Sequence, residues 1–248
     1  MFNESSKDWA RDKPKLLSDW TARPFLIQWC SPIADKKILD LGCGEGYFTR
    51  RLIRSSDESP KHVEGLDISS EMIELAKINE DQRPRGISYS VGCATDFSAQ
   101  LSNYDLITAV FVYNYTTVEE MHQSMKRVHD HMEVGGHFVF SLPHPVNPFI
   151  ESGLDSFYFE RSGGWFSGRD QTFEGKMAQG MALRSRSAAF TKPLRTYSTG
   201  CAMPALFTFL NFANSVSPTN FTPKTRTSLD HWWIFPFMSH SRSGSDVR

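Results

Sequence analysis

The chain has 248 residues, of which 40% are hydrophobic and 22% are charged, and its formal net charge at pH 7 is −1. This length and composition are ordinary for one globular domain, or a domain with an appendage, that can bury a sizeable core. The near-zero net charge argues against a dedicated nucleic-acid-binding protein, which usually carries a basic excess.

Strands and helices are predicted to alternate after a polar and aromatic lead-in over residues 1–35. This rhythm is typical of right-handed βαβ units, and it predicts an α/β fold with a Rossmann-like, doubly wound, mostly parallel sheet. Ligands of such sheets bind beyond the carboxyl ends of the strands. The predicted strands cover residues 36–41, 62–67, 86–92, 104–113 and 137–145, and the predicted helices cover 46–56, 69–81 and 117–133.

Two helix boundaries can be assigned from local sequence. Ser69 or Ser70 is the expected N-cap of the second helix, because a hydroxyl can accept a hydrogen bond from an N–H of the first turn. Gly135 and Gly136 are expected to end the third helix before the fifth strand begins.

Cysteine usage and hydropathy indicate a reduced, cytoplasmic protein. The four cysteines, Cys30, Cys43, Cys93 and Cys201, contain no CxxC pair, which argues against a metal site or a disulfide framework. Residues 1–15 lack the apolar stretch of a secretory signal, and the chain contains no run of about 18 apolar residues. We therefore expect neither a metal nor a membrane partner.

A glycine loop follows the first predicted strand. Its pattern is DxGxGxG, formed by Asp40, Gly42, Gly44 and Gly46. A phosphate loop would require Lys and Ser or Thr after Gly46, and a dinucleotide fingerprint would require glycine where Tyr47 stands. The carboxylate of Asp40 would repel a phosphate, whereas it suits a cationic ligand.

With the stretch ILDLGCGEGYFTR, residues 36–145 resemble the class I S-adenosylmethionine-dependent methyltransferases. The resemblance implies that the glycine loop surrounds the methionine and ribose parts of the cofactor and that Asp67 accepts hydrogen bonds from both ribose hydroxyls. Ile68 and Met72 would lie under the adenine, although Met72 could equally belong to the helix core. The implied cofactor-binding residues are Asp40, Gly42, Cys43, Gly44, Gly46, Asp67, Ile68, Met72, Ala94, Asp96 and Val110.

The turn after the third strand departs from the family pattern. Where the family often has GDA, this chain reads GCATDF, and the thiol of Cys93 accepts hydrogen bonds poorly. Either Asp96 or the backbone of Ala94 would then recognise the adenine amino group. Asp96 could instead cap the next helix.

Methyl transfer needs an aligned acceptor more than it needs a catalytic triad, because the cofactor is already activated. The candidates near the transfer point are Tyr113, Asn114 and Tyr115 after the fourth strand and His144 after the fifth, and of these we take His144, Tyr113 and Tyr115 as the catalytic candidates. A histidine with an ordinary pKa of about 6.5 suits a general base. The alternative is that His144 bonds to backbone and that the tyrosines pack at the sheet edge. The aromatic and glycine-rich residues 147–176 are expected to cover a small acceptor.

The predicted methyltransferase domain covers residues 36–177, and residues 178–248 form an atypical tail with eight Lys or Arg and two Asp. We hypothesise that this tail is translated out of frame, because a shifted reading of residues 231–240 resembles the last strand of such enzymes. The rival interpretation is a genuine basic tail that binds nucleic acid or a membrane surface. On the first interpretation the closing strands are missing or disrupted, and the edge of the fifth strand is unprotected.

The sequence therefore predicts an S-adenosylmethionine-dependent methyltransferase that acts on a small-molecule acceptor, without a nucleic-acid or membrane partner. The alternative is a truncated or non-catalytic protein that at most binds the cofactor. A nucleotide-dependent oxidoreductase is disfavoured by Tyr47 in the fingerprint position. The pattern indicates no particular oligomeric state.

Overall fold

A computed structural model of the chain describes residues 11, 13, 14, 16–54, 59–143, 157–159, 172–179, 182–190 and 232–239. The strands are β1 (Lys37–Leu41), β2 (His62–Asp67), β3 (Ile87–Val91), β4 (Tyr104–Val110), β5 (Met132–Pro143), β6 (Phe157–Phe159), β7 (Thr172–Gln179), β8 (Ala182–Phe190) and β9 (Trp232–Ser239). The helices are α2 (Leu17–Trp20), α3 (Ala22–Cys30), α4 (Tyr47–Arg54), α5 (Ser70–Gln82) and α6 (Val118–His131), with a short 3₁₀ helix η1 (Tyr113–Tyr115).

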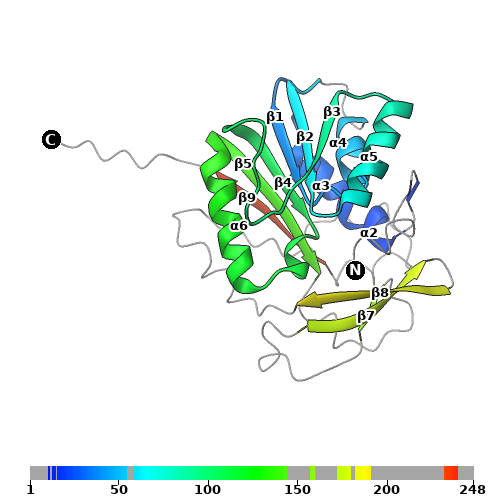
Figure 1. The fold of residues 1–248 in the computed structure, drawn as a ribbon. Helices are drawn as coiled ribbons and strands as arrows, with labels where there is room; N and C mark the ends of the chain where they lie inside the picture. Colours follow the sequence, from blue (N-terminus) through cyan, green and yellow to red (C-terminus); the bar gives the residue numbers. More distant parts are fainter. Residues whose placement is uncertain are drawn as a thin grey trace, which may run out of the picture.

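A six-stranded sheet forms the centre of the fold, in the order β3-β2-β1-β4-β5-β9 (Figure 1). Strands β1 to β5 pair in parallel, and β9 pairs antiparallel with β5. The predicted Rossmann-like α/β sheet is therefore confirmed. The strand order reverses between β1 and β4, which is where open α/β sheets bind ligands.

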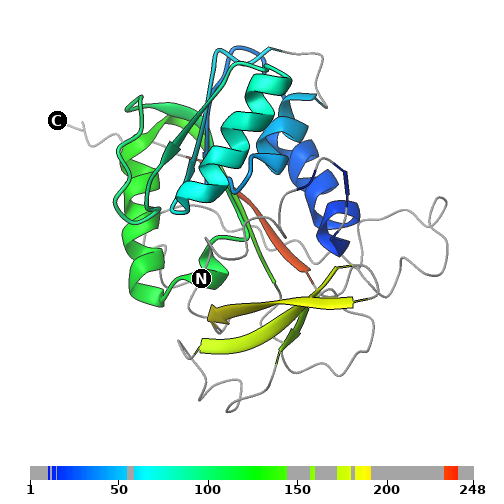
Figure 2. The same ribbon diagram turned by 45° about the vertical axis from the view of Figure 1, so that its right-hand side comes forward.

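Buried side chains alternate between the two faces of the sheet, and each face has its own hydrophobic core. Leu39 and Ile107 pack into the core that α6 covers, whereas Ile38 and Leu106 pack into the core that α3, α4 and α5 cover (Figure 2). Successive side chains of a strand point to opposite faces, so a strand buried on both sides reads as a continuous apolar run.

Side chains cap the two longest helices at their amino-terminal ends. Ser69 is the N-cap of α5, and its hydroxyl accepts a hydrogen bond from the N–H of Met72 at 3.3 Å. Thr117 and Glu120 form a reciprocal capping box at the start of α6. These caps satisfy N–H groups that have no partner within the helix, and they fix where each helix leaves the sheet.

The prediction that Gly135 and Gly136 end α6 is wrong. The helix ends at His131, and β5 begins at Met132 and runs through Gly135 and Gly136. A register shift lets Met132 pair with Tyr104 before regular pairing resumes. A Cβ on Gly136 would lie 2.9 Å from the carbonyl oxygen of Tyr104, so glycine here permits close approach of two strands.

The expectation of an unprotected edge on β5 is wrong for this structure. Strand β9 pairs with β5 from Pro143↔Trp232 to His137↔Ser239 and therefore takes one closing position of the sheet. A register shift falls between Phe138 and Phe140, opposite the part of β9 that contains Pro236. Proline lacks an N–H and is tolerated in edge strands and bulges. Among the described strands, β9 is the last one in the sheet.

A second, three-stranded antiparallel sheet has the order β6-β7-β8. Both views place its β7–β8 hairpin below the carboxyl end of β5, and β8 contacts η1 (Figures 1 and 2). The boundary predicted after Met177 falls inside β7. Within the described residues, no helix is long and apolar enough to cross a membrane.

Candidate functional site

The glycine loop between β1 and α4 places three glycines in left-handed backbone conformations. Gly42, Gly44 and Gly46 have φ angles of +64°, +56° and +78°, a region that other residues rarely adopt. A Cβ on Gly42 would lie 2.5 Å from Cγ2 of Val112, whereas a Cβ on Gly44 would meet no atom within 4 Å. The loop therefore packs tightly at Gly42 and leaves open space at Gly44.

Asp67, the last residue of β2, is tied to the glycine loop. Its Oδ2 accepts a hydrogen bond from the N–H of Gly44 at 2.8 Å, and its Oδ1 accepts one from the N–H of Ser69 at 2.9 Å. Burial raises the pKa of this carboxyl above its ordinary value, and the backbone N–H donors oppose that shift. Each carboxylate oxygen has two lone pairs, so both can accept a second hydrogen bond from a ligand.

Asp40 is the most enclosed carboxyl of the loop region, with 2% of its surface exposed. Its two oxygens accept hydrogen bonds from the hydroxyls of Thr49 at 2.5 Å and Thr108 at 2.7 Å. Burial raises the pKa of Asp40 from 3.8 to about 6, although both hydroxyls stabilise the charged form. Among the described residues no cationic side chain is bonded to this buried carboxylate, which is therefore well suited to a positively charged ligand.

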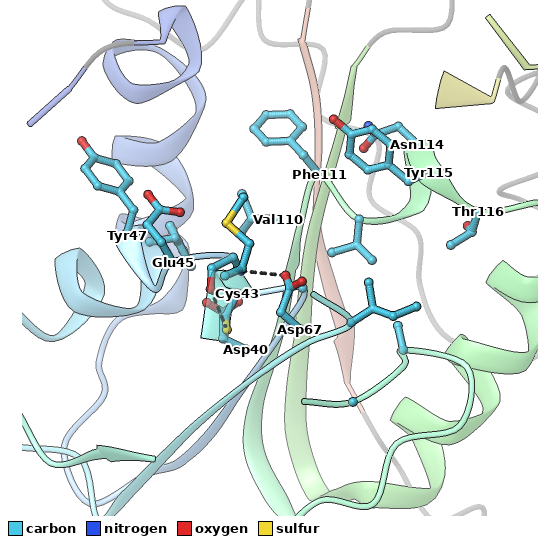
Figure 3. A pocket seen from close by; sticks show the side chains of 18 of the residues that line it. Asp40, Cys43, Glu45, Tyr47, Asp67, Val110, Phe111, Asn114, Tyr115 and Thr116 are labelled. Carbon is cyan, nitrogen blue, oxygen red and sulfur yellow. Dashed lines mark hydrogen bonds between the residues drawn. The ribbon is translucent and has the colours of Figure 1, made fainter. Parts of the chain in front are cut away.

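A cavity of about 280 Å³ opens beyond the carboxyl ends of β1, β2 and β4, between the glycine loop and η1 (Figure 3). It is lined by most of the residues that the sequence assigned to the cofactor. These are Asp40, Gly42, Cys43, Gly44, Asp67, Ile68, Met72, Ala94 and Val110, together with the catalytic candidate Tyr115.

Two predicted cofactor residues do not line this cavity. Gly46 lies one step further along the loop, where a Cβ would collide with the hydroxyl of Tyr89 at 2.3 Å. The side chain of Asp96 is 86% exposed and pairs with Arg127 at 3.0 Å. Neither position fits direct contact with a ligand in the cavity, and of the two candidates for adenine recognition only Ala94 lies at its wall.

Tyr113 also lies away from the cavity. Its side chain is fully buried, its hydroxyl is 3.1 Å from that of Ser124, and its ring packs edge-on against Phe138 and Phe140. The position does not fit the catalytic role that the sequence suggested for Tyr113. The ring instead anchors η1 in the core under α6. His144, the third catalytic candidate, lies outside the described residues.

Sequence reasoning missed a buried charged cluster that the lead-in contributes to the cavity wall. Asp19 pairs with Arg11 at 3.2 Å and with Arg23 at 2.9 Å, and Arg11 also lies 3.6 Å from Glu45. The Arg11 guanidinium stacks over Tyr47 at 4.3 Å from the ring centre. Arg11, Arg23, Glu45 and Tyr47 line the cavity. No local pattern marks this cluster, because α2 and α3 meet the loop only in the folded chain.

Burial tunes two members of this cluster in opposite directions. Desolvation lowers the pKa of Arg23 to about 10, so the guanidinium stays protonated at neutral pH. Desolvation raises the pKa of Glu45, and the neighbouring Arg11 opposes that shift. The amino-terminal part of the site therefore offers cationic guanidinium groups, held by the buried carboxylate of Asp19, beside the buried carboxyl of Glu45.

The segment after β4 forms the other wall of the cavity. The sequence predicted only some of the residues in this wall. Phe111 has a φ of +60°, which is rare for a bulky side chain and marks a backbone held in place by its surroundings. Its N–H donates to the carbonyl of Ser141 at 3.1 Å. Phe111, Asn114 and Thr116 line the cavity with Tyr115. Within the described residues, no group of three His, Cys, Asp or Glu side chains could hold a metal ion.

The fold and this site define a Rossmann-like α/β protein with a cavity between a glycine loop and a strand-end carboxylate, an arrangement that suits an adenosine-type cofactor. Residues 38–136 match the family described as a methyltransferase domain. This part of the chain, residues 38–136, is thus a class I S-adenosylmethionine-dependent methyltransferase domain, and the cofactor of that family is S-adenosylmethionine.

Curated relatives of the chain include several with methyltransferase names. The chain is 30% identical over 106 residues to a malonyl-[acyl-carrier protein] O-methyltransferase of Priestia megaterium, covering 42% of this chain and 35% of that protein. It is 23% identical over 113 residues to a ubiquinone biosynthesis O-methyltransferase of Thiobacillus denitrificans, covering 44% and 47%. The chain thus spans about half or less of the length of these relatives.

Solved structures support the fold over most of the chain. The CcbJ methyltransferase from Streptomyces caelestis superposes with a TM-score of 0.63 at 13% identity, covering 97% of both chains. An S-adenosylmethionine-dependent methyltransferase from Mesorhizobium loti superposes with a TM-score of 0.59 at 19% identity, covering 86% of this chain and 95% of that one. At these identities the likeness shows the shared architecture alone.

The residues present fit S-adenosylmethionine. The open space at Gly44 lets a ligand approach the backbone, and Asp67 retains acceptor capacity for two hydroxyls. Ile68 is 60% exposed and Met72 supplies an apolar wall, as an adenine ring requires. Asp40, Arg23 and Glu45 supply charges for a sulfonium and for an amino-acid group.

Proposed function

We propose that this protein is an S-adenosylmethionine-dependent methyltransferase that acts on a small-molecule acceptor. The observation that supports this most directly is a single cavity in which the glycine loop, Asp67 and η1 meet at the carboxyl ends of the parallel strands. One side of that cavity has the groups that a nucleoside needs. The other side, formed after β4, leaves room for a second ligand.

The nucleoside end of the proposed site lies at β2 and α5. Asp67 would bind the ribose hydroxyls, while Ile68 and Met72 would contact the adenine. The backbone of Ala94 would recognise the adenine edge, since the Asp96 carboxylate points to solvent. The Cys93 thiol, 3.1 Å from the hydroxyl of Thr95, already has a local partner.

The amino-acid end would lie at the buried charged cluster. Arg23 and Arg11 offer guanidinium donors that match the planar geometry of a carboxylate. Glu45 offers a carboxyl for an ammonium group: its Oε1 lies 3.6 Å from Arg11 but accepts no hydrogen bond from the described residues. The pairing with Asp19 orients both arginines before a ligand arrives, which lowers the entropic cost of binding.

When bound, S-adenosylmethionine supplies a methyl group on a positively charged sulfur. The protein then has to hold the acceptor in line with that carbon and exclude water. Phe111, Val112 and Tyr115 give the acceptor side of the cavity apolar and aromatic walls. We retain Tyr115 as a candidate that touches the acceptor and His144 as a candidate general base.

A small-molecule acceptor agrees with the names of the two relatives, a malonyl-[acyl-carrier protein] O-methyltransferase and a ubiquinone biosynthesis O-methyltransferase. The near-zero net charge gives no general attraction for nucleic acid. The sequence predicts that residues 147–176 cover the acceptor, and β6 and the first part of β7 belong to this segment. The adjoining strand β8, which contacts η1, would extend the cover.

The test is a binding and turnover experiment on the full chain. Calorimetric titration with S-adenosylmethionine, S-adenosylhomocysteine and NAD should give binding for the first two and none for NAD. Transfer of a radioactive methyl group should then be measured against phenols, catechols, amines and carboxylic acids. Binding of NAD in place of S-adenosylmethionine would overturn the proposal, and cofactor binding without transfer to any acceptor would favour the non-catalytic alternative.

A further inference from the structure

Asn114, the middle residue of η1, has a buried polar atom that the fold leaves unused. The residue is 8% exposed and lines the cavity. Its side-chain oxygen Oδ1 is buried and has no hydrogen-bond partner among the described residues. Buried polar groups are nearly always paired, and an unpaired one is costly. An unpaired acceptor on a residue that lines the cavity is therefore a candidate partner for a donor group of a ligand.

The fold fixes where this side chain lies. Consecutive residues of a 3₁₀ helix point about 120° apart, so Tyr113, Asn114 and Tyr115 cannot share one direction. Tyr113 is locked into the core by Ser124 and the Phe138–Phe140 pair. This leaves Asn114 and Tyr115 for the cavity side.

Neighbouring bonds hold η1 in this orientation. The N–H of Tyr115 donates to the carbonyl of Val112 at 2.9 Å, and the hydroxyl of Thr116 donates to the carbonyl of Tyr113 at 3.3 Å. The amide of Asn114 is therefore carried on a pinned turn rather than on a free loop. Its position does not have to be ordered when a ligand binds.

Asn114 lies on the opposite wall from the groups proposed for the amino-acid end of the cofactor. Figure 3 shows Asn114, Tyr115 and Thr116 together on one side, with Glu45 and Tyr47 on the other and Asp67 between them. The segment after β4 lines the cavity with the apolar and aromatic residues Phe111, Val112 and Tyr115, and also with the polar residues Thr116 and Glu120. An unpaired acceptor oxygen in such surroundings favours a ligand that brings a donor group to it on a partly apolar body.

We propose that Asn114 binds the hydroxyl or amine group that receives the methyl, and that it determines which acceptors are used. The inference rests on the proposed methyltransferase function. The amide oxygen would accept the O–H or N–H of the nucleophile and so turn its lone pair toward the methyl carbon. That lone pair forms the new bond to carbon, the electrons of the carbon–sulfur bond stay on sulfur, and the proton leaves to water. Asn114 cannot take the proton itself, because an amide is not a base at neutral pH.

Bisubstrate probes can test this without a known acceptor. These are nitrogen analogues of S-adenosylmethionine in which an amine replaces the sulfonium and carries a side arm of two or three carbons. The arm ends in a hydroxyl, an amino group or a methyl group. Calorimetric titration of the full chain gives the affinity of each probe, with S-adenosylhomocysteine as the reference ligand.

The expected result for the native chain is that a hydroxyl or amino arm binds about three- to tenfold more tightly than the methyl arm, as one added hydrogen bond implies. Asn114→Ala should remove this preference while leaving the affinity for S-adenosylhomocysteine unchanged. Asn114→Asp should favour the amino arm over the hydroxyl arm, because a carboxylate attracts an ammonium. The arm that the native chain prefers distinguishes an amine nucleophile from a hydroxyl.

Asn103→Ala is the matched control, because this asparagine lies before β4 rather than after it and donates to Glu133 at 2.6 Å. It should keep the preference of the native chain. Equal affinity for all three arms in the native chain would overturn the role of Asn114, and so would a preference that survives in Asn114→Ala. If the native chain does not bind S-adenosylhomocysteine at all, the proposed function itself is overturned.

Discussion

The N–H of Gly44 donates a hydrogen bond of 2.8 Å to the carboxylate of Asp67. This bond joins the glycine loop after β1 to the acidic end of β2, 23 residues further along the chain. One contact thus holds two parts of the cofactor site at a fixed separation. The carboxylate that orders the loop is also the group proposed to bind the ribose.

Asp67→Asn should weaken binding of S-adenosylmethionine and S-adenosylhomocysteine about 10- to 100-fold, as expected when charge-assisted hydrogen bonds are lost. Asp105→Asn is the control, since Asp105 also accepts a backbone hydrogen bond, from Lys37 at 2.8 Å, but at the start of β4 and outside the cavity. Calorimetry measures both. Equal losses in the two variants would show that Asp67 acts only on folding.

Gly44→Ala and Gly86→Ala form a pair that separates strain from binding. Both glycines have positive φ angles, +56° and +75°, and neither would bring a Cβ within 4 Å of another atom. Each substitution should lower the free energy of unfolding by about 1–2 kcal/mol, the cost of a left-handed alanine. Only Gly44→Ala should also lose cofactor affinity, because Gly44 lines the cavity.

Denaturant unfolding measures the change in the free energy of unfolding of the two variants, and calorimetry measures their cofactor affinity. Retained affinity in Gly44→Ala at the native level would contradict close contact between the cofactor and this part of the loop.

Asp40 should make the preference for the cationic cofactor depend on pH. Its pKa is raised from 3.8 to about 6, so the fold favours the protonated form and loses stability as pH rises through this interval. A bound sulfonium, which is positively charged, stabilises the charged form of the Asp40 carboxyl instead. The affinity ratio of S-adenosylmethionine to the uncharged S-adenosylhomocysteine should therefore rise, by up to about tenfold, between pH 5 and pH 7.

Taking the ratio of the two ligands cancels contributions that they share, such as ribose binding by Asp67. In Asp40→Asn the ratio should stay flat across the same pH range, because no carboxyl remains to titrate at this position. A pH-dependent ratio that persists in Asp40→Asn would assign the effect to another group.

Arg23 should contribute to binding only through the amino-acid part of the cofactor. Arg23→Ala should weaken S-adenosylhomocysteine about tenfold or more, yet change the affinity for 5′-methylthioadenosine, which lacks the amino acid, by less than about twofold. Arg127→Ala is the control, because Arg127 packs on Phe97 outside the cavity. Similar losses for both ligands in Arg23→Ala would point to a general disturbance of the fold.

The origin of residues 178–248 has a direct test. If this segment is translated out of frame, as we propose, a chain with the frame restored should melt several degrees higher, because both closing strands would complete the sheet. Differential scanning calorimetry of the two chains measures this. Recovery of peptides from the written frame in the native source, with no gain in melting temperature on restoring the frame, would support a genuine tail.

Much of the cofactor site follows from local sequence. The spacing of Gly42, Gly44 and Gly46 requires a particular backbone shape, and a carboxylate at the end of β2 is placed by the strand that precedes it. Once β1 and β2 pair in parallel, their carboxyl ends lie at the same edge of the sheet, and this brings the glycines and the carboxylate together. The caps at Ser69 and Thr117 are also local, because each hydroxyl accepts a hydrogen bond from an N–H in the first turn of the helix that follows it.

Other features arise only from contacts between distant parts of the chain. Arg11 and Arg23 reach the cavity because α2 and α3 pack beside the glycine loop, and Tyr113 leaves it because the core under α6 takes its ring. The pairing of β9 with β5 joins segments almost 100 residues apart, which no sequence period specifies. Sequence patterns report the conformation of neighbouring residues. The direction of Asn114 and the partners of Asp19 depend on which surfaces remain to be buried once the sheet has formed.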